Sequence, residues 1–209
     1  MNLNPQAILF DLDGVLIDSE GLYTEFWQKT EALYPTGIPD LAHAIKGTNL
    51  PSIMSHFKPH ERADIMARIF EFDNNIEYPL FPGAERFLQL LQQRNIPAAL
   101  VTSSNPEKMQ QLFRQYPHFS SYFSAIVDGS MVSNGKPDPE GYLLAAQLLE
   151  KHPGQCVVIE DSLQGIRAGI AAGAQVWGLY TTLKPSLIEA ETPFVFADIS
   201  RILSLFIAD

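Results

Sequence analysis

Four carboxylates, Asp11, Asp13, Glu160 and Asp161, each stand just after a short apolar run of the chain. Brought into one site without a counter-charge, these groups would repel one another, and the repulsion would raise their pKa values. A hard divalent cation removes this repulsion, and carboxylate and water oxygens are the ligands that Mg²⁺ prefers. The four residues therefore predict a Mg²⁺ site, provided that the fold brings the two stretches together.

A lysine and a threonine add groups that suit a phosphoryl ligand. Lys136, in the turn Gly135-Lys136-Pro137, brings positive charge, and Thr102 follows another apolar run. The Thr102 hydroxyl, nearby backbone N–H groups and the start of a predicted helix over 105–115 are suited to phosphate oxygens. Lys136 and the metal ion would together offset the charge of a phosphoryl group.

Asp11 and Asp13 are two residues apart, so on an extended segment their side chains face the same side. Two carboxylates beside a phosphate can divide a reaction. One attacks phosphorus and becomes an aspartyl phosphate, and the other exchanges a proton with the leaving group and later with water. An ordinary aspartic acid, with a pKa of about 3.9, is ionised at pH 7, so the acid needs surroundings that raise its pKa.

Short apolar runs alternate with amphipathic stretches, a pattern that predicts strands buried on both faces between helices. Strands are expected at 7–10, 98–101, 125–127 and 156–159, and less strongly at 176–179 and 194–196. Helices are expected at 83–94, 139–151 and 162–173. This alternation is typical of an α/β fold with a doubly wound parallel sheet. Such sheets bind ligands outside the carboxyl ends of their strands, which is where the polar residues stand.

One long segment interrupts this alternation. Residues 18–79 contain helical patterns at 22–33 and 61–72, several prolines and no strand-like run. We interpret the segment as an all-helical domain inserted after the first strand. The α/β core then consists of residues 1–17 and 80–209.

The composition argues against several classes of protein. The 209 residues are 46% hydrophobic and include a single cysteine, which is typical of a globular protein without a disulfide framework. The net charge of −10, from 24 acidic and 14 basic residues, argues against a nucleic-acid partner. No apolar stretch approaches the roughly 20 residues of a membrane helix. Residues 1–5 lack the basic start of a secretory signal, so we expect a cytoplasmic protein.

The motifs resemble those of a known family. The stretch Phe10-Asp11-Leu12-Asp13-Gly14-Val15-Leu16 resembles the signature of the haloacid dehalogenase-like phosphatase superfamily. Thr102, Lys136 and Glu160-Asp161 match the later motifs of that superfamily in order. The helical insertion is similar to the cap domain of the β-phosphoglucomutase-like branch. The resemblance implies the α/β core of this superfamily with a helical cap.

The resemblance also implies catalytic roles. Asp11 would be the nucleophile and Asp13 the general acid and base. Thr102 and the Ser103 backbone would hold the phosphoryl group, and Lys136 would neutralise its charge.

The same resemblance implies a ligand set for Mg²⁺. The ion would be bound by the Asp11 side chain, the Asp13 backbone carbonyl and Asp161. Glu160 would be a further ligand, direct or through water, or a support for the others.

The insertion departs from the mutase pattern. Tyr23 stands where β-phosphoglucomutases carry a histidine, and the stretch 45–52 keeps Lys46 but has no arginine to hold a second phosphate. Tyr23, Lys46 and Asn49 are the candidate substrate contacts of the insertion. The departure favours simple hydrolysis, and we expect a Mg²⁺-dependent phosphatase for a sugar or polyol monophosphate.

Two alternatives stay open. A sugar phosphomutase would interconvert phosphate esters and release little phosphate. A non-catalytic protein that binds metabolites would use the same fold without turnover. The expected partner is in each case a small phosphorylated metabolite, with no nucleic acid or membrane, and the expected state is a monomer. The sequence does not specify which ester is bound.

Overall fold

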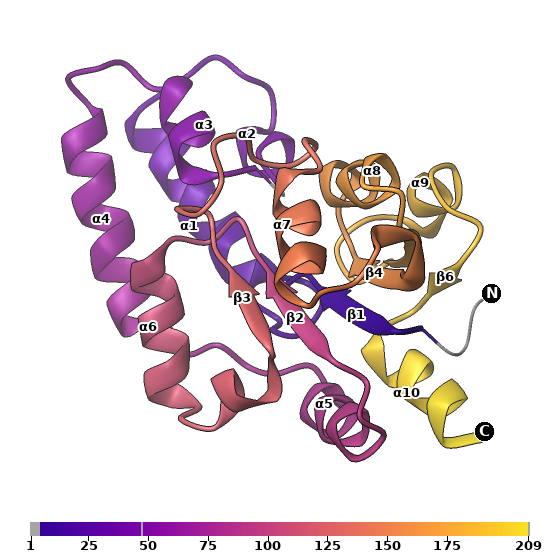
Figure 1. Ribbon diagram of the computed structural model, residues 1–209. Helices are drawn as coiled ribbons and strands as arrows, with labels where there is room; N and C mark the ends of the chain where they lie inside the picture. Colours follow the sequence, from indigo (N-terminus) through magenta and orange to yellow (C-terminus); the bar gives the residue numbers. More distant parts are fainter. Residues whose placement is uncertain (1–4, 47, 209) are drawn as a thin grey trace.

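The computed structural model describes residues 5–46 and 48–208. Six parallel strands form one sheet in the order β3-β2-β1-β4-β5-β6 (Figure 1). The strands are β1 (Ala7–Phe10), β2 (Ala98–Val101), β3 (Ala125–Val127), β4 (Cys156–Glu160), β5 (Gln175–Leu179) and β6 (Val195–Phe196). The four strong strand predictions and the two weaker ones are all confirmed. The prediction about a targeting signal rests on residues that lie mostly outside the described ranges.

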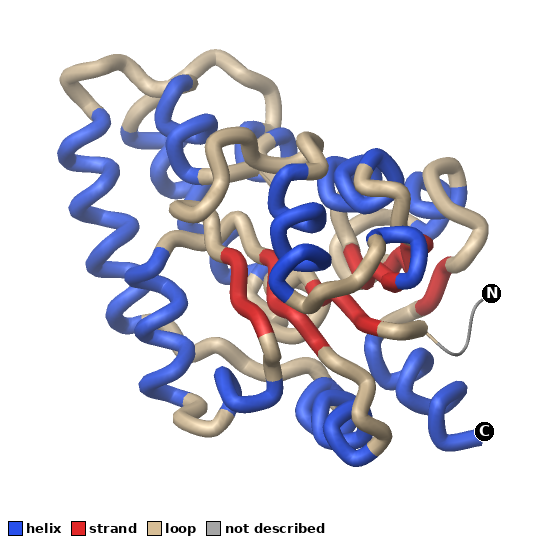
Figure 2. Tube along the Cα trace, in the orientation of Figure 1, coloured by secondary structure: helices blue, strands red, loops and turns tan. Residues whose placement is uncertain are grey.

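Helices pack on both faces of this sheet (Figure 2). One apolar layer packs between the sheet and α7 (Glu140–Leu148), α8 (Leu163–Ala171) and α9 (Pro185–Glu189). The other layer packs against α5 (Ala84–Gln93), α6 (Pro106–Gln115) and α10 (Ile199–Ala208). Two short 3₁₀ helices are found at Phe119–Tyr122 and Pro153–Gln155. The prediction of a doubly wound α/β fold is therefore confirmed.

The alternation of side chains along β1 explains why this strand is wholly apolar. Ile8 and Phe10 belong to one of the two apolar layers, whereas Ala7 and Leu9 belong to the other. All four residues have no exposed surface. A strand that is covered on both faces needs apolar side chains at every position.

The order of the strands locates the binding crevice. β1 lies between β2 and β4, and the strand order reverses on its two sides. In doubly wound sheets the ligand site lies at this reversal, outside the carboxyl ends of the strands. The chain segments that follow β1, β2 and β4 are those in which the polar motifs were found.

The segment between β1 and α5 is helical. It contains α1 (Glu20–Leu33), α2 (Leu41–Ala44), α3 (Leu50–Ser55) and α4 (Arg62–Asn75). These helices enclose an apolar cluster of their own, in which Trp27 stacks on Phe57 at 6.2 Å between ring centroids. We refer to residues 18–79 as the helical insertion. Among the described residues, no helix is long and apolar enough to cross a membrane.

The chain enters and leaves the helical insertion at one place. The Asp18 N–H donates to the Pro79 carbonyl at 2.8 Å, and the Phe81 N–H donates to the Leu16 carbonyl at 2.9 Å. Ile17 and Leu80 form an isolated antiparallel bridge between these contacts. The two connections are therefore paired with each other, next to the predicted domain limits.

Candidate active site

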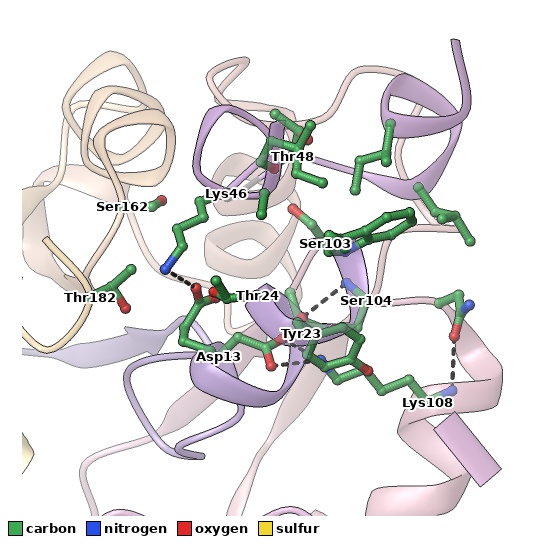
Figure 3. A pocket seen from close by; sticks show the side chains of 18 of the residues that line it. Asp13, Tyr23, Thr24, Lys46, Thr48, Ser103, Ser104, Lys108, Ser162 and Thr182 are labelled. Atoms are coloured by element: carbon green, nitrogen blue, oxygen red, sulfur yellow. Dashed lines mark hydrogen bonds and ion pairs between the residues drawn. The ribbon is translucent and has the colours of Figure 1, made fainter. Parts of the chain in front are cut away.

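A cavity of about 130 Å³ lies between the carboxyl ends of the strands and the helical insertion (Figure 3). It is many times larger than the roughly 10–15 Å³ that one water molecule needs. Seven of the residues predicted from the sequence line it: Asp11, Asp13, Tyr23, Lys46, Thr102, Ser103 and Asp161. We call this space the active-site cavity.

Asp11 is the first residue after β1 and remains part of the sheet. Its N–H donates to the Ile159 carbonyl at 3.0 Å, so the backbone of β1 fixes its position. The Asp11 carboxylate accepts a hydrogen bond from the Lys136 ammonium at 2.5 Å. Burial raises the pKa of Asp11 well above its ordinary value, and the opposing effect of Lys136 is smaller.

A tight turn follows Asp11 and depends on a glycine. The Leu12 carbonyl accepts hydrogen bonds from the N–H groups of Leu16 and Ile17 at 2.8 and 3.1 Å. Gly14 adopts a φ of +77°, and a β-carbon there would lie 2.0 Å from the Asp161 carboxylate. Only glycine therefore combines this backbone conformation with the close approach of the turn to Asp161.

Lys136 joins two carboxylates below the cavity. Its ammonium lies 2.5 Å from an Asp11 oxygen and 2.6 Å from a Glu160 oxygen, and it also donates to the Val101 carbonyl at 3.2 Å. Burial alone would lower the pKa of Lys136, but the charges of Asp11 and Glu160 outweigh burial and hold the pKa well above its usual value. Lys136 is therefore a fixed positive charge beside Asp11.

Glu160 is fully buried and its two oxygens are both hydrogen-bonded. One oxygen accepts from Lys136 at 2.6 Å and from the Tyr142 hydroxyl at 2.9 Å. The other accepts from the N–H groups of Asp161 and Ser162 and from the Ser162 hydroxyl, each at 3.0 Å. At Gly165 a β-carbon would lie 1.6 Å from Glu160 Oε1, so α8 approaches this carboxylate only because residue 165 is glycine.

Asp11, Glu160 and Asp161 form a cluster that fits a divalent cation. Each offers one carboxylate oxygen, and these oxygens lie within 4.8 Å of one another. Burial, followed by the charges of Glu160 and Asp11, raises the pKa of Asp161 well above its ordinary value. Three buried carboxylates so close together, with Lys136 beside two of them, could serve as ligands of a hard metal ion.

Thr102 and Ser103 follow β2 at the same edge of the sheet. The Thr102 N–H donates to the Val127 carbonyl at 2.9 Å, and its hydroxyl accepts from the Ser104 N–H at 3.0 Å. Two residues later Asn105 caps α6, because its side chain accepts from the Lys108 N–H at 2.8 Å. The N-terminal end of α6, where the helix dipole favours anions, therefore follows directly on the predicted phosphate-binding residues.

Asp13 lies in a different hydrogen-bonding network from Asp11. Its two carboxylate oxygens accept from the Lys108 ammonium at 2.6 and 2.7 Å. Ser104 donates to the same carboxylate at 3.1 Å, and the Ser19 hydroxyl also donates to it. Asp11 and Asp13 thus line one cavity, and different lysines hold their carboxylates.

Lys108 contacts Asp13 in the active-site cavity and is not among the residues predicted from the sequence. It is 6% exposed, and its ammonium lies 4.1 Å from the ring centroid of Tyr23 on the helical insertion. The Tyr23 hydroxyl in turn donates to Asp73 of α4 at 2.5 Å. A signal for this lysine existed in the sequence, because residues 108 and 112 are one helical turn apart and Leu112 is fully buried.

The other two candidates on the helical insertion lie in different places. Lys46 lines the active-site cavity and forms an ion pair with Glu20 at 2.8 Å. Asn49 caps α3 by accepting from the Ser52 N–H at 3.0 Å. A β-carbon at Gly135 would lie 2.5 Å from Asn49, which places Asn49 against the turn of the core rather than among the residues that line the active-site cavity.

The family model of haloacid dehalogenase-like hydrolases matches residues 5–173, which include the catalytic motifs and the helical insertion. The chain belongs to this family. It is 33% identical over 199 residues to a phosphorylated carbohydrates phosphatase from Thermotoga maritima, and the match covers 88% of this chain and 91% of that protein. The recognition made from the motifs is thereby confirmed.

This haloacid dehalogenase-like hydrolase is also similar to one longer bifunctional enzyme and to one solved structure. A bifunctional riboflavin kinase/FMN phosphatase from Arabidopsis thaliana is 32% identical over 180 residues, and the match covers 81% of this chain but 47% of that longer protein. A putative β-phosphoglucomutase structure from Thermotoga maritima is 30% identical with a TM-score of 0.72, and covers 97% of this chain and 98% of that one. The family and these relatives make the chain a phosphoric monoester hydrolase.

Proposed function

We propose that this hydrolase is a Mg²⁺-dependent phosphatase of a small phosphorylated metabolite and that it acts through an aspartyl phosphate on Asp11. The observation that carries the proposal is the surroundings of Asp11. Its carboxylate lies at the end of β1, contacts the Lys136 ammonium at 2.5 Å and belongs to the cluster with Glu160 and Asp161. A carboxylate fixed beside both a cation and a metal-binding group is suited to attack a phosphoryl group.

In the first step a carboxylate oxygen of Asp11 attacks phosphorus, and the bond from phosphorus to the leaving oxygen breaks. Asp13 donates its proton to that oxygen, so the product leaves as a neutral alcohol. Thr102 and the Ser103 backbone hold the oxygens of the phosphoryl group. Lys136, whose charge is fixed by Asp11 and Glu160, offsets the negative charge that develops on this group.

In the second step water attacks the phosphorus of the aspartyl phosphate. The ionised Asp13 takes a proton from this water, and the bond between phosphorus and Asp11 breaks. Phosphate leaves, Asp11 is again a carboxylate and Asp13 is again protonated. The Lys108 ammonium, 2.6 Å from an Asp13 oxygen, holds this carboxyl group in place.

Asp11 and Asp161, with the Asp13 backbone carbonyl, are the residues that would hold Mg²⁺. When bound, the ion supplies charge stabilisation to the phosphoryl group and removes the repulsion between the buried carboxylates. Both oxygens of Glu160 are already hydrogen-bonded within the protein, which favours the supporting role among those open to it.

The relatives bear on the substrate class. One relative is named for phosphorylated carbohydrates and another for FMN. Both substrates are phosphate monoesters of small polyhydroxylated molecules. This agrees with the sugar or polyol monophosphate expected from the sequence. We place this reaction in the cytoplasm, catalysed by a monomer of this chain.

A mutase function is less well supported. A phosphomutase has to hold the second phosphate of a bisphosphate while the intermediate turns over. None of the described residues that line the active-site cavity is an arginine, and Lys46 is already paired with Glu20 at 2.8 Å. These observations favour hydrolysis over phosphoryl transfer between two positions of a sugar.

The test measures phosphate release from a panel of metabolite monophosphates by wild-type protein and by Asp11→Asn. We expect release in the presence of Mg²⁺, none with a chelator, and a loss of at least about a thousandfold in the variant, because the amide is not a nucleophile toward phosphorus. A radiolabelled substrate should label the wild-type protein transiently and leave Asp11→Asn unlabelled.

Other outcomes would reject the proposal in different ways. Interconversion of sugar phosphates that depends on a bisphosphate and yields little phosphate would show a mutase. A folded wild-type protein that binds Mg²⁺ and phosphorylated metabolites but releases no phosphate from any of them would show a binding protein.

A further inference from the structure

We infer that Asp73 of the helical insertion binds a hydroxyl of the leaving group and thereby selects polyol phosphates over esters of unsubstituted alcohols. The inference rests on the proposed phosphatase function and names the residue that would recognise its class of substrate. Asp73 lies in α4 and lines the active-site cavity, but no step of the proposed mechanism uses it.

Asp73 is a buried carboxylate with a single partner. It is 4% exposed, and its Oδ1 accepts a hydrogen bond from the Tyr23 hydroxyl at 2.5 Å. Among residues 5–46 and 48–208, no other group donates to this carboxylate and no cationic side chain forms an ion pair with it. An ionised carboxylate accepts about four hydrogen bonds, and a buried one is normally paired. Asp73 therefore has unused capacity to accept hydrogen bonds.

The second oxygen of Asp73, Oδ2, opens onto the active-site cavity. In the part of the chain that the structure describes, the one fully buried side-chain oxygen without a partner belongs to Thr182. Oδ2 of Asp73 also lacks a partner, so it is not enclosed by protein atoms and contacts the adjoining space. That space is the active-site cavity, which Asp73 lines.

The other carboxylates that line the cavity have a partner or a use. Asp13 and Glu20 each form an ion pair with a lysine, at 2.6 and 2.8 Å. Asp11 and Asp161 belong to the cluster that would hold Mg²⁺. Asp73 differs from these four, because neither a lysine nor the metal site accounts for its second oxygen.

Asp73 lies on the side of the cavity where the leaving group begins. In the proposed mechanism Asp13 protonates the leaving oxygen, and Lys108 holds Asp13 at 2.6 Å. The Lys108 ammonium lies 4.1 Å from the centroid of the Tyr23 ring, whose hydroxyl reaches Asp73. Figure 3 shows Asp13, Tyr23 and Lys108 around the same part of the cavity. One lysine and one tyrosine side chain thus connect Asp73 to the acid beside the leaving group.

Electrostatics agrees with this placement. Burial raises the pKa of Asp73 above its ordinary value, whereas the hydrogen bond from Tyr23 and the nearby charge of Lys108 oppose the rise. Lys108 is already paired with Asp13, so its charge is shared between the two carboxylates. A further donor at Oδ2 would complete the hydrogen bonds of Asp73.

The hydroxyl groups of a polyol supply the donor that Oδ2 lacks. A hydrogen bond from a hydroxyl to a carboxylate is roughly twice as strong as one between neutral groups. An alkyl chain in the same place would cover Oδ2 without donating to it and leave a buried acceptor unpaired. A site built to bond a hydroxyl rejects an analogue that lacks the hydroxyl for this reason.

The test compares two esters with the same carbon chain. Sorbitol 6-phosphate and hexyl phosphate both carry the phosphate on the terminal CH₂ group of a six-carbon chain, and only sorbitol has a hydroxyl on each of the other carbons. A hydroxyl is therefore available wherever the chain passes Asp73. We expect kcat/KM for sorbitol 6-phosphate to be at least tenfold higher in the presence of Mg²⁺. An equal or lower value would overturn the inference.

Variants on α4 assign this preference to Asp73. Asp73→Ala removes the acceptor and should lower the preference for sorbitol 6-phosphate at least fivefold. Because both esters are measured on the same variant, a loss of folded protein cancels from the ratio. Asp73→Asn keeps the size of the side chain but replaces the carboxylate by a neutral amide, and should lower the preference at least twofold. Asp64 is exposed on the same helix outside the cavity, so Asp64→Ala should leave the preference unchanged.

Tyr23→Phe distinguishes recognition by Asp73 from a purely structural role. This variant removes the hydroxyl that donates to Oδ1 and keeps Asp73. We expect Tyr23→Phe to retain most of the preference for sorbitol 6-phosphate. If Tyr23→Phe loses the preference as fully as Asp73→Ala, or if Asp73→Ala keeps it, Asp73 does not bind the leaving group and the inference is overturned.

Acetyl phosphate separates failure of this inference from failure of the proposed function, because its leaving group is too small to reach beyond the catalytic residues. Mg²⁺-dependent hydrolysis of acetyl phosphate without a preference for sorbitol 6-phosphate would overturn the inference and leave the phosphatase function standing. If the folded wild-type protein hydrolyses none of the three compounds, the proposed function is wrong and the inference is lost with it.

Discussion

The active-site cavity has a floor at the carboxyl ends of β1, β2 and β4 and a wall formed by the helical insertion, and the two are held in different ways. On the floor, the buried carboxylates of Asp11 and Glu160 share the Lys136 ammonium, and both oxygens of Glu160 are hydrogen-bonded within the protein. On the wall, apolar side chains of the helical insertion alternate with polar ones, and Lys46 is paired with Glu20.

The difference follows from how each region positions its side chains. In the sheet, Phe10 is in register with Ile159, so the residues that follow, Asp11 and Glu160, leave neighbouring strands side by side. Backbone hydrogen bonds fix this placement. In the helical insertion no sheet holds the side chains, and their positions depend on apolar packing such as that of Trp27 on Phe57. The floor is therefore positioned by the backbone of the sheet, and the wall by side-chain packing.

The largest effect is expected from breaking the floor at Gly165. In Gly165→Ala the new β-carbon would lie 1.6 Å from Glu160 Oε1, so the carboxylate has to move. Glu160 positions Lys136, and a displacement of about 1 Å in a catalytic site can reduce the rate a hundredfold. We expect kcat/KM for acetyl phosphate to fall by about that factor and the free energy of unfolding to fall by about 1–3 kcal/mol.

The control for this change is a glycine of the helical insertion. Gly21 lies in α1 and a β-carbon there would meet nothing within 4 Å. Gly21→Ala should raise the free energy of unfolding by about 0.5–1 kcal/mol, since alanine is the better helix former. Urea denaturation measures both variants. Equal effects at the two glycines would contradict the distinction between floor and wall.

The next effect concerns Lys108, which connects the floor with the helical insertion. Lys108→Met removes the ammonium that holds both oxygens of Asp13 at 2.6 and 2.7 Å. We expect kcat to fall tenfold to a hundredfold while KM changes little. This loss is smaller than the whole contribution of an acid–base group, because Asp13 is displaced but still present. A fall in kcat at constant KM distinguishes this positioning role from a general loss of folded protein, which would lower the apparent kcat of every variant in proportion to the unfolded fraction.

Two further variants sharpen this prediction. Lys108→Arg keeps the positive charge and should restore a part of kcat. Lys29 forms an exposed ion pair with Glu25 on α1, so Lys29→Met should leave both kcat and KM unchanged. If Lys108→Met had the kinetics of Lys29→Met, Lys108 would have no role in positioning Asp13.

A moderate effect is expected from pH on the metal site. Burial raises the pKa of both Asp11 and Asp161, so the folded protein binds protons on these groups at a pH where the unfolded chain has lost them. In the absence of metal, the free energy of unfolding therefore falls as the pH rises from the ordinary carboxyl pKa to the raised one. Mg²⁺ binds the ionised groups and should reverse this loss.

The measurement compares thermal unfolding at pH 5 and pH 8, with and without Mg²⁺. The increase in Tm caused by Mg²⁺ should be larger at pH 8. As the pH is lowered, the affinity for Mg²⁺ should fall up to tenfold per pH unit for each proton that the ion displaces. Asp161→Asn should remove most of the Mg²⁺ effect at both pH values. An increase in Tm that is the same at pH 5 and pH 8 in the wild-type protein would contradict the raised pKa values.

The smallest effect is expected on the wall. Replacing the pair Lys46 and Glu20 together, as Lys46→Met with Glu20→Gln, removes two partly exposed charges that neutralise each other. We expect kcat/KM for a sugar monophosphate that the wild-type protein hydrolyses to change by less than about fivefold, since such pairs are worth about 1 kcal/mol or less. Steady-state kinetics check the value. A much larger loss would mean that Lys46 holds a charged part of the substrate.

Much of the fold was predictable because local patterns and tertiary structure agree. The apolar run 7–10 is buried on both faces, as a strand between two helical layers has to be. The predicted helix 162–173 corresponds to α8, which Ser162 caps by accepting from the Gly165 N–H at 3.0 Å. The polar residues after β1, β2 and β4 meet at one edge because parallel strands share the direction of their carboxyl ends.

Other parts of the site depend on contacts between distant segments. Lys108 looks like an ordinary helix residue until α6 is packed beside the turn that carries Asp13. The pairing of Tyr23 with Asp73 joins α1 to α4 and likewise depends on how these helices pack. The partners in these two contacts are 50 or more positions apart, so local patterns do not reveal the pairing, although the spacing of Lys108 from Leu112 indicates a buried helix position.

The sequence by itself determined the family, the parallel sheet and which polar residues meet at the carboxyl ends of its strands, because each of these follows from residue types at fixed local spacings. Only the tertiary structure decided that Asp11 and Asp13 are held by different lysines, that Glu160 accepts from Lys136, Tyr142 and backbone N–H groups, and which side chains of the helical insertion face them. These features depend on which segments face each other across the cavity, and that is set by packing.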